Sequence, residues 1–109
     1  MSFLYLIIAI VAEVIATSAM KASNGFSQLS ASIITVIGYA VAIYFLSLTM
    51  KTIPVGITYA LWSGAGIILV SLVGFFYYKQ HLDLAAIIGL IFMILGILII
   101  HLFSKSTEI

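Results

Sequence analysis

Apolar residues dominate the chain, and three short polar stretches divide them into four long segments. The segments cover about 3–20, 31–50, 55–78 and 84–103. The stretches between them read KASNGFSQLS, KTIP and KQHLD, and they carry turn formers, lysines and the single proline. A helix needs about 20 apolar residues to cross the roughly 30 Å of hydrocarbon in a bilayer. The pattern therefore predicts an all-α membrane protein with four transmembrane helices, which form one domain over residues 1–109.

The ends of the segments carry signals typical of helix termini. Pro54 suits a first helical turn, because the N–H that proline lacks would have no partner there. Asp83 is expected to cap the last helix at its N-terminus. The third segment closes on FFYYK, an aromatic run followed by a lysine, which favours a position at the lipid–water interface. A cleaved signal peptide is disfavoured for the first segment, because a carboxylate lies at its centre and no basic residue precedes it.

Composition supports the membrane assignment. Charged side chains make up 6% of the chain and the mean hydropathy is +1.39, whereas a soluble domain carries about 25% charged residues. The net charge of +1 and the lack of a basic tract argue against nucleic acid as a partner. The chain has no cysteine, and its two histidines, His81 and His101, lie far apart, so we expect no metal site. No nucleophile–base pair is evident, which argues against an enzyme.

The lysines give no orientation signal. Four spans place both termini on one side, with Lys51 and Lys105 there and Lys21 and Lys79 on the other. Such a tie is either chance in a small sample or a sign of dual topology, in which copies insert both ways up. Dual topology permits an antiparallel homodimer, with the inverted symmetry that larger transporters build within one chain. Because four helices barely enclose a cavity, we expect a solute pathway to need at least two copies.

A single carboxylate, Glu13, interrupts the middle of the first segment. A charge at the bilayer centre costs about 2.5–3.5 kcal/mol on insertion scales, so such groups usually face a protein interior or a wet cavity. Small residues dominate the same helical face and leave room for a ligand or a second helix. That face carries Ala9, Ile10, Ala16 and Thr17.

No lysine is expected near Glu13, since all four lie close to segment ends. A site of this kind binds either a proton or an organic cation, and that competition is what an antiporter needs. The alternative is a protonated Glu13 that only donates a hydrogen bond between helices.

Interior aromatic residues offer a surface for an organic cation, because aromatic faces attract cations. Tyr59 and Trp62 lie three residues apart in the third segment. Tyr39 lies in the second, where its hydroxyl needs a partner and Glu13 is the only interior carboxylate. Aromatic residues in membrane helices also serve packing or the interface, and this interpretation stays open.

Two pairs of glycines point to close contacts or bends. Gly64 and Gly66 follow Trp62 and favour either tight packing or a bend that changes between transport states. Gly89 and Gly96 lie seven residues apart on one face of the fourth segment, which has no carboxylate or aromatic hydroxyl in its interior. We therefore expect the fourth helix to mediate dimerisation, while the first three line the pathway.

Several motifs together resemble the small multidrug resistance family of bacteria. They read AEVIATSAMK around Glu13, NGF in the first loop, IPVGITYALWSGAGI in the third segment and LDLAAIIG at the start of the fourth. The resemblance covers essentially the whole chain. It implies an antiparallel homodimer in the bacterial inner (plasma) membrane that exchanges protons for quaternary ammonium and other lipophilic cations. It implies no cofactor, with the proton gradient as the energy source.

The resemblance also implies roles for individual residues. Glu13 becomes the shared site of proton and cation. Gly64 and Gly66 are implied to form a kink in the third helix, and Gly89 and Gly96 to form the dimer contact. The residues implied to contact substrate are Leu6, Ala9, Ile10, Ala16, Thr17, Tyr39, Tyr59 and Trp62.

Three positions depart from a multidrug member of the family. Ala16 replaces a glycine, Ala42 a serine and Tyr44 a tryptophan, which bears on the substrate range more than on the proton site. A sister group that exports guanidinium has Trp-Thr-Gly where this chain has Trp62 followed by Ser-Gly. This difference favours multidrug export. A guanidinium exporter and a non-transporting membrane subunit are the alternatives.

Overall fold

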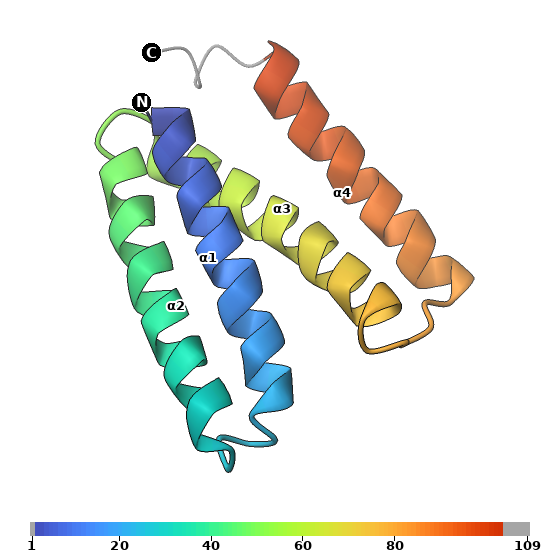
Figure 1. The fold of residues 1–109 in the computed structure, drawn as a ribbon. Helices are drawn as coiled ribbons and strands as arrows, with labels where there is room; N and C mark the ends of the chain where they lie inside the picture. Colours follow the sequence, from blue (N-terminus) through green and yellow to red (C-terminus); the bar gives the residue numbers. More distant parts are fainter. Residues whose placement is uncertain (1, 104–109) are drawn as a thin grey trace.

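The computed structural model describes residues 2–103, which form four α-helices joined by short connections (Figure 1). The helices are α1 (Ser2–Ala22), α2 (Leu29–Thr49), α3 (Val55–Phe76) and α4 (Leu84–Phe103). Each is long and apolar enough to cross a bilayer. No strand occurs between residues 2 and 103, and the prediction of an all-α membrane fold with four spanning helices is confirmed.

The connections follow from the chemistry of a few polar side chains. The Ser23 hydroxyl, buried after α1, donates to the Met20 carbonyl (2.7 Å) and accepts the Phe26 N–H (3.0 Å). Before α4, the carboxylate of Asp83 accepts the Ala86 N–H at 2.8 Å, which is the expected N-cap. The N–H groups of Phe26 and Ala86 thereby gain partners that the helices do not supply.

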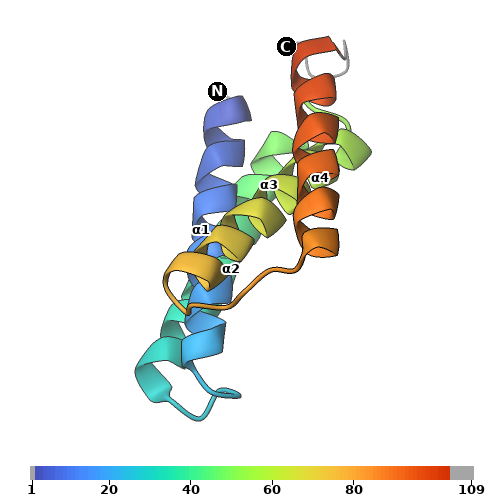
Figure 2. The ribbon, with the colours of Figure 1, turned by 90° about the vertical axis from the view of Figure 1, so that its right-hand side faces the viewer.

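The helices are not packed equally. α1 lies between α2 and α3 and contacts both, and α4 packs against α3 (Figures 1 and 2). Near the C-terminal end of α4, the His101 ring meets the Phe3 ring of α1 edge to face, with centroids 5.5 Å apart. The arrangement makes α1 the central helix, so its side chains face neighbours on two sides.

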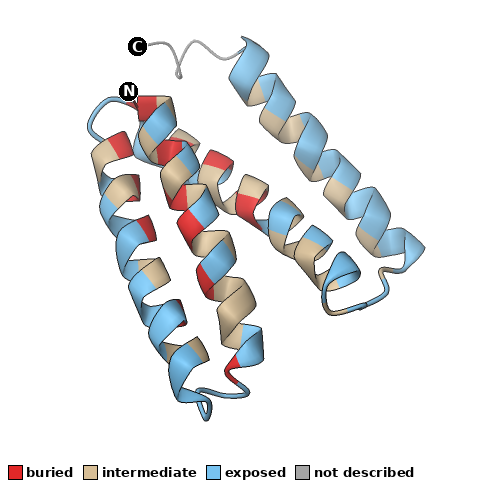
Figure 3. Cartoon of the chain, in the orientation of Figure 1, coloured by how far each residue is buried: buried red, intermediate tan, exposed pale blue. Residues whose placement is uncertain are grey.

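The buried core is small and centred on α1 (Figure 3). Its apolar cluster joins α1 to α2 and α3 and consists of Leu6, Ala9, Leu46 and Leu61. None of the residues of α4 is buried. The first three helices therefore form the packed unit, and α4 is attached to it through α3.

Small residues bring α1 and α2 into close contact. A Cβ atom added to Gly38 would lie 2.8 Å from the Cβ of Ala16 and 3.2 Å from the carbonyl oxygen of Ala12. Both distances are too short for an unshifted structure, so only glycine fits at position 38 at this helix spacing. This is the small-residue contact by which membrane helices approach each other.

Candidate functional site

Glu13 lies on α1 where that helix faces α3, and its two carboxyl oxygens have different surroundings. Oε1 accepts a hydrogen bond from the Thr17 hydroxyl, one turn further along α1, at 3.0 Å. Oε2 is buried and has no hydrogen-bond partner among the residues that the structure describes. A buried polar atom without a partner is costly. The carboxyl group is therefore stabilised when it takes up a proton or when a cation binds beside Oε2.

The carboxyl group of Glu13 rests against the bare backbone of α3 at Gly66. A Cβ atom at position 66 would lie 2.6 Å from Oε2 and 3.3 Å from the carboxyl carbon. Gly66 is itself buried. Position 66 therefore accepts only glycine while the carboxyl group stays in place. The kink expected at Gly64 and Gly66 stays a prediction, whereas the contact with Glu13 is a role for Gly66 that sequence reasoning missed.

A chain of hydrogen bonds connects α2 to Glu13 through Thr17. The hydroxyls of Thr17 and Tyr39 are hydrogen-bonded to each other. Thr17 has one hydroxyl proton and gives it to Glu13, so the Tyr39 O–H is the donor to Thr17. The sequence suggested Glu13 itself as the partner of Tyr39. In the structure Tyr39 reaches the carboxyl group only through the intervening hydroxyl.

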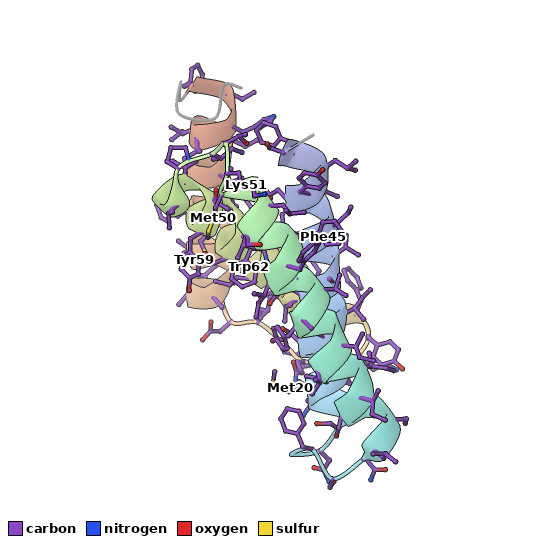
Figure 4. The ribbon with its side chains drawn as sticks, turned by 90° about the vertical axis from the view of Figure 1, so that its left-hand side faces the viewer. Met20, Phe45, Met50, Lys51, Tyr59 and Trp62 are labelled. Atoms are coloured by element: carbon purple, nitrogen blue, oxygen red, sulfur yellow. The ribbon has the colours of Figure 1, made fainter. Side chains whose placement is uncertain are left out.

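Tyr59 and Trp62 form an aromatic pair on α3 (Figure 4). Their ring centroids lie 5.7 Å apart, with the planes tilted by 45°. The Trp62 indole N–H points to the carbonyl oxygen of Ala9 on α1, at a long 3.4 Å, which fixes the ring beside the core. Tyr59 is 57% exposed, so most of its ring has no cover within the chain. The Trp62 ring is thus held in place, while most of the Tyr59 ring is exposed.

The remaining residues expected at the site on α1 mostly face neighbouring helices. Leu6 and Ala9 are buried in the core, and Ile10 packs against it. Ala16 is fully buried against Gly38 in the α1–α2 contact. Substrate contact at these positions stays a prediction, and within one chain they serve helix packing.

The glycines expected at the dimer contact lie in open space. A Cβ atom at Gly89 or Gly96 would have no atom of the described residues within 4 Å. Gly64, by contrast, is buried against α4, where an added Cβ would lie 2.9 Å from Cδ1 of Ile97. Gly96 borders a cavity beside Gly64 of α3, and Gly89 is exposed. The role of the two glycines in dimerisation stays a prediction.

Comparison with known proteins gives the family. The family model described as Small Multidrug Resistance protein matches residues 1–103. The chain belongs to the small multidrug resistance family. It is 49% identical over 105 residues to the multidrug transporter EmrE of Escherichia coli, covering 96% of each chain. It is 51% identical over 106 residues to a multidrug transporter of Pseudomonas aeruginosa, covering 97% of this chain and 96% of the relative.

A third relative carries a substrate class in its name. The quaternary ammonium compound-resistance protein QacE of Escherichia coli is 45% identical over 105 residues, covering 96% of each chain. Members of the small multidrug resistance family are transporters and not enzymes. With four apolar spanning helices, this member is a multi-pass protein of the bacterial inner membrane. The predicted family, fold class and localisation are thereby confirmed.

Proposed function

We propose that this transporter exports lipophilic and quaternary ammonium cations in exchange for protons. The observation that carries the proposal is Glu13, half-buried in the middle of a spanning helix, whose Oε2 atom is buried and free of any hydrogen bond within the described residues. The relatives named for multidrug transport and for resistance to quaternary ammonium compounds support the substrate class.

Coupling follows from competition for one carboxylate. In a low dielectric, ionised Glu13 needs a positive partner, which is either a proton on the carboxyl group or a cation beside it. A proton on the carboxyl group and a cation beside it destabilise each other. Binding of either one therefore lowers the affinity of Glu13 for the other. A proton gradient then releases the cation on one side and leaves the site free on the other. Apart from this gradient, the scheme needs no cofactor.

The aromatic pair supplies the attraction for an organic cation. Trp62 is held against Ala9, and Tyr59 stands 5.7 Å from it with its outer face open. Lipophilic cations are weakly hydrated and gain cation–π energy from such rings, on the order of 2 kcal/mol once water is excluded. Glu13 and the pair thus offer charge and apolar contact to the same ligand.

The working unit in this proposal is an antiparallel homodimer. Within residues 2–103 the Tyr59 ring is mostly exposed, and a Cβ added at Gly89 or Gly96 of α4 meets no atom within 4 Å. A second copy would cover both. The even split of lysines between the two membrane sides supports insertion in both orientations.

The test is proton release on cation binding. Purified protein in weakly buffered detergent at slightly acid pH receives tetraphenylphosphonium, and the pH is recorded. We expect release from the wild type and from Asp83→Asn, which changes a carboxylate in the loop before α4. We expect neither release nor binding in Glu13→Gln.

Other outcomes redirect the assignment. Cation binding by the wild type without proton release would contradict coupling through Glu13. Growth protection against guanidinium salts alone, with no binding of tetraphenylphosphonium, would support a guanidinium exporter. Absence of binding for every cation tested would support a non-transporting membrane subunit.

A further inference from the structure

A small pocket opens between α1 and α3 next to the coupling carboxyl group. Its volume is about 130 Å³. Thr17 lines it, and the Thr17 hydroxyl donates to Glu13. The residues that line it include Thr17, Ser18 and Lys21 of α1, Val70 and Gly74 of α3, and Gln80 of the following loop. We call this space the Thr17 pocket.

Polar residues line the Thr17 pocket together with apolar ones. Lys21, in the last turn of α1, and Gln80, after the end of α3, are exposed. Thr17 and Ser18 are half-buried. The Ser18 hydroxyl is buried and has no hydrogen-bond partner in the described part of the chain. Buried polar groups are normally paired with protein or ordered water, so this hydroxyl calls for a water molecule in the pocket.

Size suits water and not an organic cation. Water takes about 30 Å³ per molecule, so the volume holds roughly four waters. Pockets for drug-sized ligands start at about 300 Å³. The hydroxyl of Tyr78 donates to the Ser18 carbonyl at 2.7 Å and ties the end of α3 to α1, which keeps the gap narrow.

We propose that the Thr17 pocket is a water-filled route by which protons reach and leave Glu13, separate from the path of the organic cation. This rests on the proposed function, because it requires Glu13 to exchange protons. A hydronium ion in the pocket gives a proton to Oγ1 of Thr17, and Thr17 passes its own hydroxyl proton to Oε1 of Glu13. Water and a neutral carboxyl group result, and the reverse sequence releases the proton.

The hydrogen bonds already present suit this relay. Thr17 donates to Oε1, so its proton is aligned for transfer to that oxygen. The titratable group on α2 that adjoins the relay is Tyr39, which donates to Thr17 and leaves the second lone pair of that hydroxyl for water. Gly66, the contact from α3, presents no titratable group.

The first experiment fills the pocket without touching Glu13. Val70→Phe places a ring in the pocket, and Val11→Phe places the same ring on an outward face of α1 that is 49% exposed. Binding of tetraphenylphosphonium is followed by fluorescence of Trp62, the single tryptophan, at alkaline and at acid pH. The alkaline pH is chosen where the wild type binds the cation without releasing a proton, and the acid pH is chosen where its binding releases one.

We expect Val70→Phe to slow cation association and proton release together at acid pH, on the order of tenfold. At alkaline pH we expect Val70→Phe to have the association rate and the affinity of the wild type. We expect Val11→Phe to behave like the wild type at both pH values. An equal effect of Val70→Phe at both pH values, or none at either, would overturn the separate route. If Val70→Phe fails to bind the cation at alkaline pH, Val70→Leu is measured instead, with a smaller slowing at acid pH expected.

A second experiment tests whether the pocket is wet. The chain has no cysteine, so Ser18→Cys and Ile34→Cys each introduce a single thiol at a similar distance from the α1–α2 loop. Ile34 is 48% exposed on the outer face of α2. We expect a small hydrophilic thiol reagent to modify the cysteine at 18 and not that at 34, with or without saturating tetraphenylphosphonium. Equal labelling, or protection of position 18 by the cation, would contradict the proposal.

The two experiments separate failure of the inference from failure of the proposed function. If the wild type binds no cation or releases no proton, the antiport mechanism itself is wrong. If the wild type does both while the pocket variants behave like the wild type, Glu13 exchanges its proton along the cation path. Thiol labelling at position 18 does not depend on transport, so its result stands whether or not the antiport mechanism is right.

Discussion

α1 and α4 are both apolar spanning helices, yet they are used in opposite ways. α1 is packed on two sides and carries Glu13 with its hydrogen bond to Thr17. α4 has no buried residue, and its main packing partner is α3. In lipid, apolar side chains gain little by leaving the solvent for another helix. The comparison teaches that small residues and polar bonds, more than hydrophobicity, decide which helix becomes the core.

The largest effect is expected where α3 meets the carboxyl group of α1. Gly66→Val puts side-chain atoms into the space of Oε2 and displaces Glu13. We expect tetraphenylphosphonium affinity to fall by about 100-fold or more, since overpacking costs about 1–3 kcal/mol and a lost ion pair adds to it. Equilibrium binding at alkaline pH measures it.

Gly56→Val is the matched control, because an added Cβ at position 56 of the same helix meets no atom within 4 Å. We expect it to bind like the wild type. An unchanged affinity in Gly66→Val would remove the basis for the contact between Gly66 and Glu13.

The next effect concerns the packing of α1 on α2. Gly38→Ala introduces a Cβ atom 2.8 Å from that of Ala16 and forces the helices apart. We expect a loss of about 1–3 kcal/mol in the free energy of unfolding. Thermal unfolding in detergent measures the loss. Gly89→Ala, whose Cβ enters open space on α4, should leave the unfolding midpoint of the monomer unchanged.

The role of α4 is tested between copies of the chain. Gly96→Leu adds a side chain at a position of α4 where an added Cβ meets no atom of the described residues within 4 Å. If this face of α4 is the dimer contact, we expect crosslinking of dimers in membranes to fall by about tenfold, which corresponds to about 1.4 kcal/mol. Ile91→Leu, at a 49% exposed position on the other side of α4, is the control. Undiminished crosslinking would move the dimer contact away from Gly96.

The smallest effect is expected from the hydrogen-bond chain behind Glu13. Thr17→Val keeps the shape of the side chain and breaks the link from Tyr39 to the carboxyl group. Each such bond contributes about 1 kcal/mol, so we expect cation affinity to change by roughly fivefold. Thr35→Val removes a buried hydroxyl that bonds only the Ala31 carbonyl, and cation affinity should not respond. Equal responses would indicate a general packing effect.

The sequence was sufficient to predict the four helices and to single out Glu13 as the candidate coupling residue. Long apolar runs predict spanning helices, and a lone carboxylate within one of them is conspicuous because its burial is costly. The contact between Gly38 and Ala16 was not predictable in the same way. A helix that is apolar all round has no stripe to show which face meets which neighbour. For the same reason the packing of Ala16 against α2 was not predictable, and its place on the binding face stays a prediction.

Contacts across helices were also beyond the sequence pattern. Thr17 was recognised as a neighbour of Glu13 on the same helix, one turn away. That Tyr39 of α2 reaches this hydroxyl, and that Gly66 of α3 touches the carboxyl group, depend on how three helices are rotated against one another. Rotation is fixed by packing that no local periodicity records.

The bare backbone of Gly66 against Glu13 has a consequence for resistance to blockers. A compound anchored between the two would touch a position where any side chain strikes the carboxyl group. If Glu13 couples transport as proposed, a substitution at position 66 that evades the compound would also displace the coupling carboxyl group.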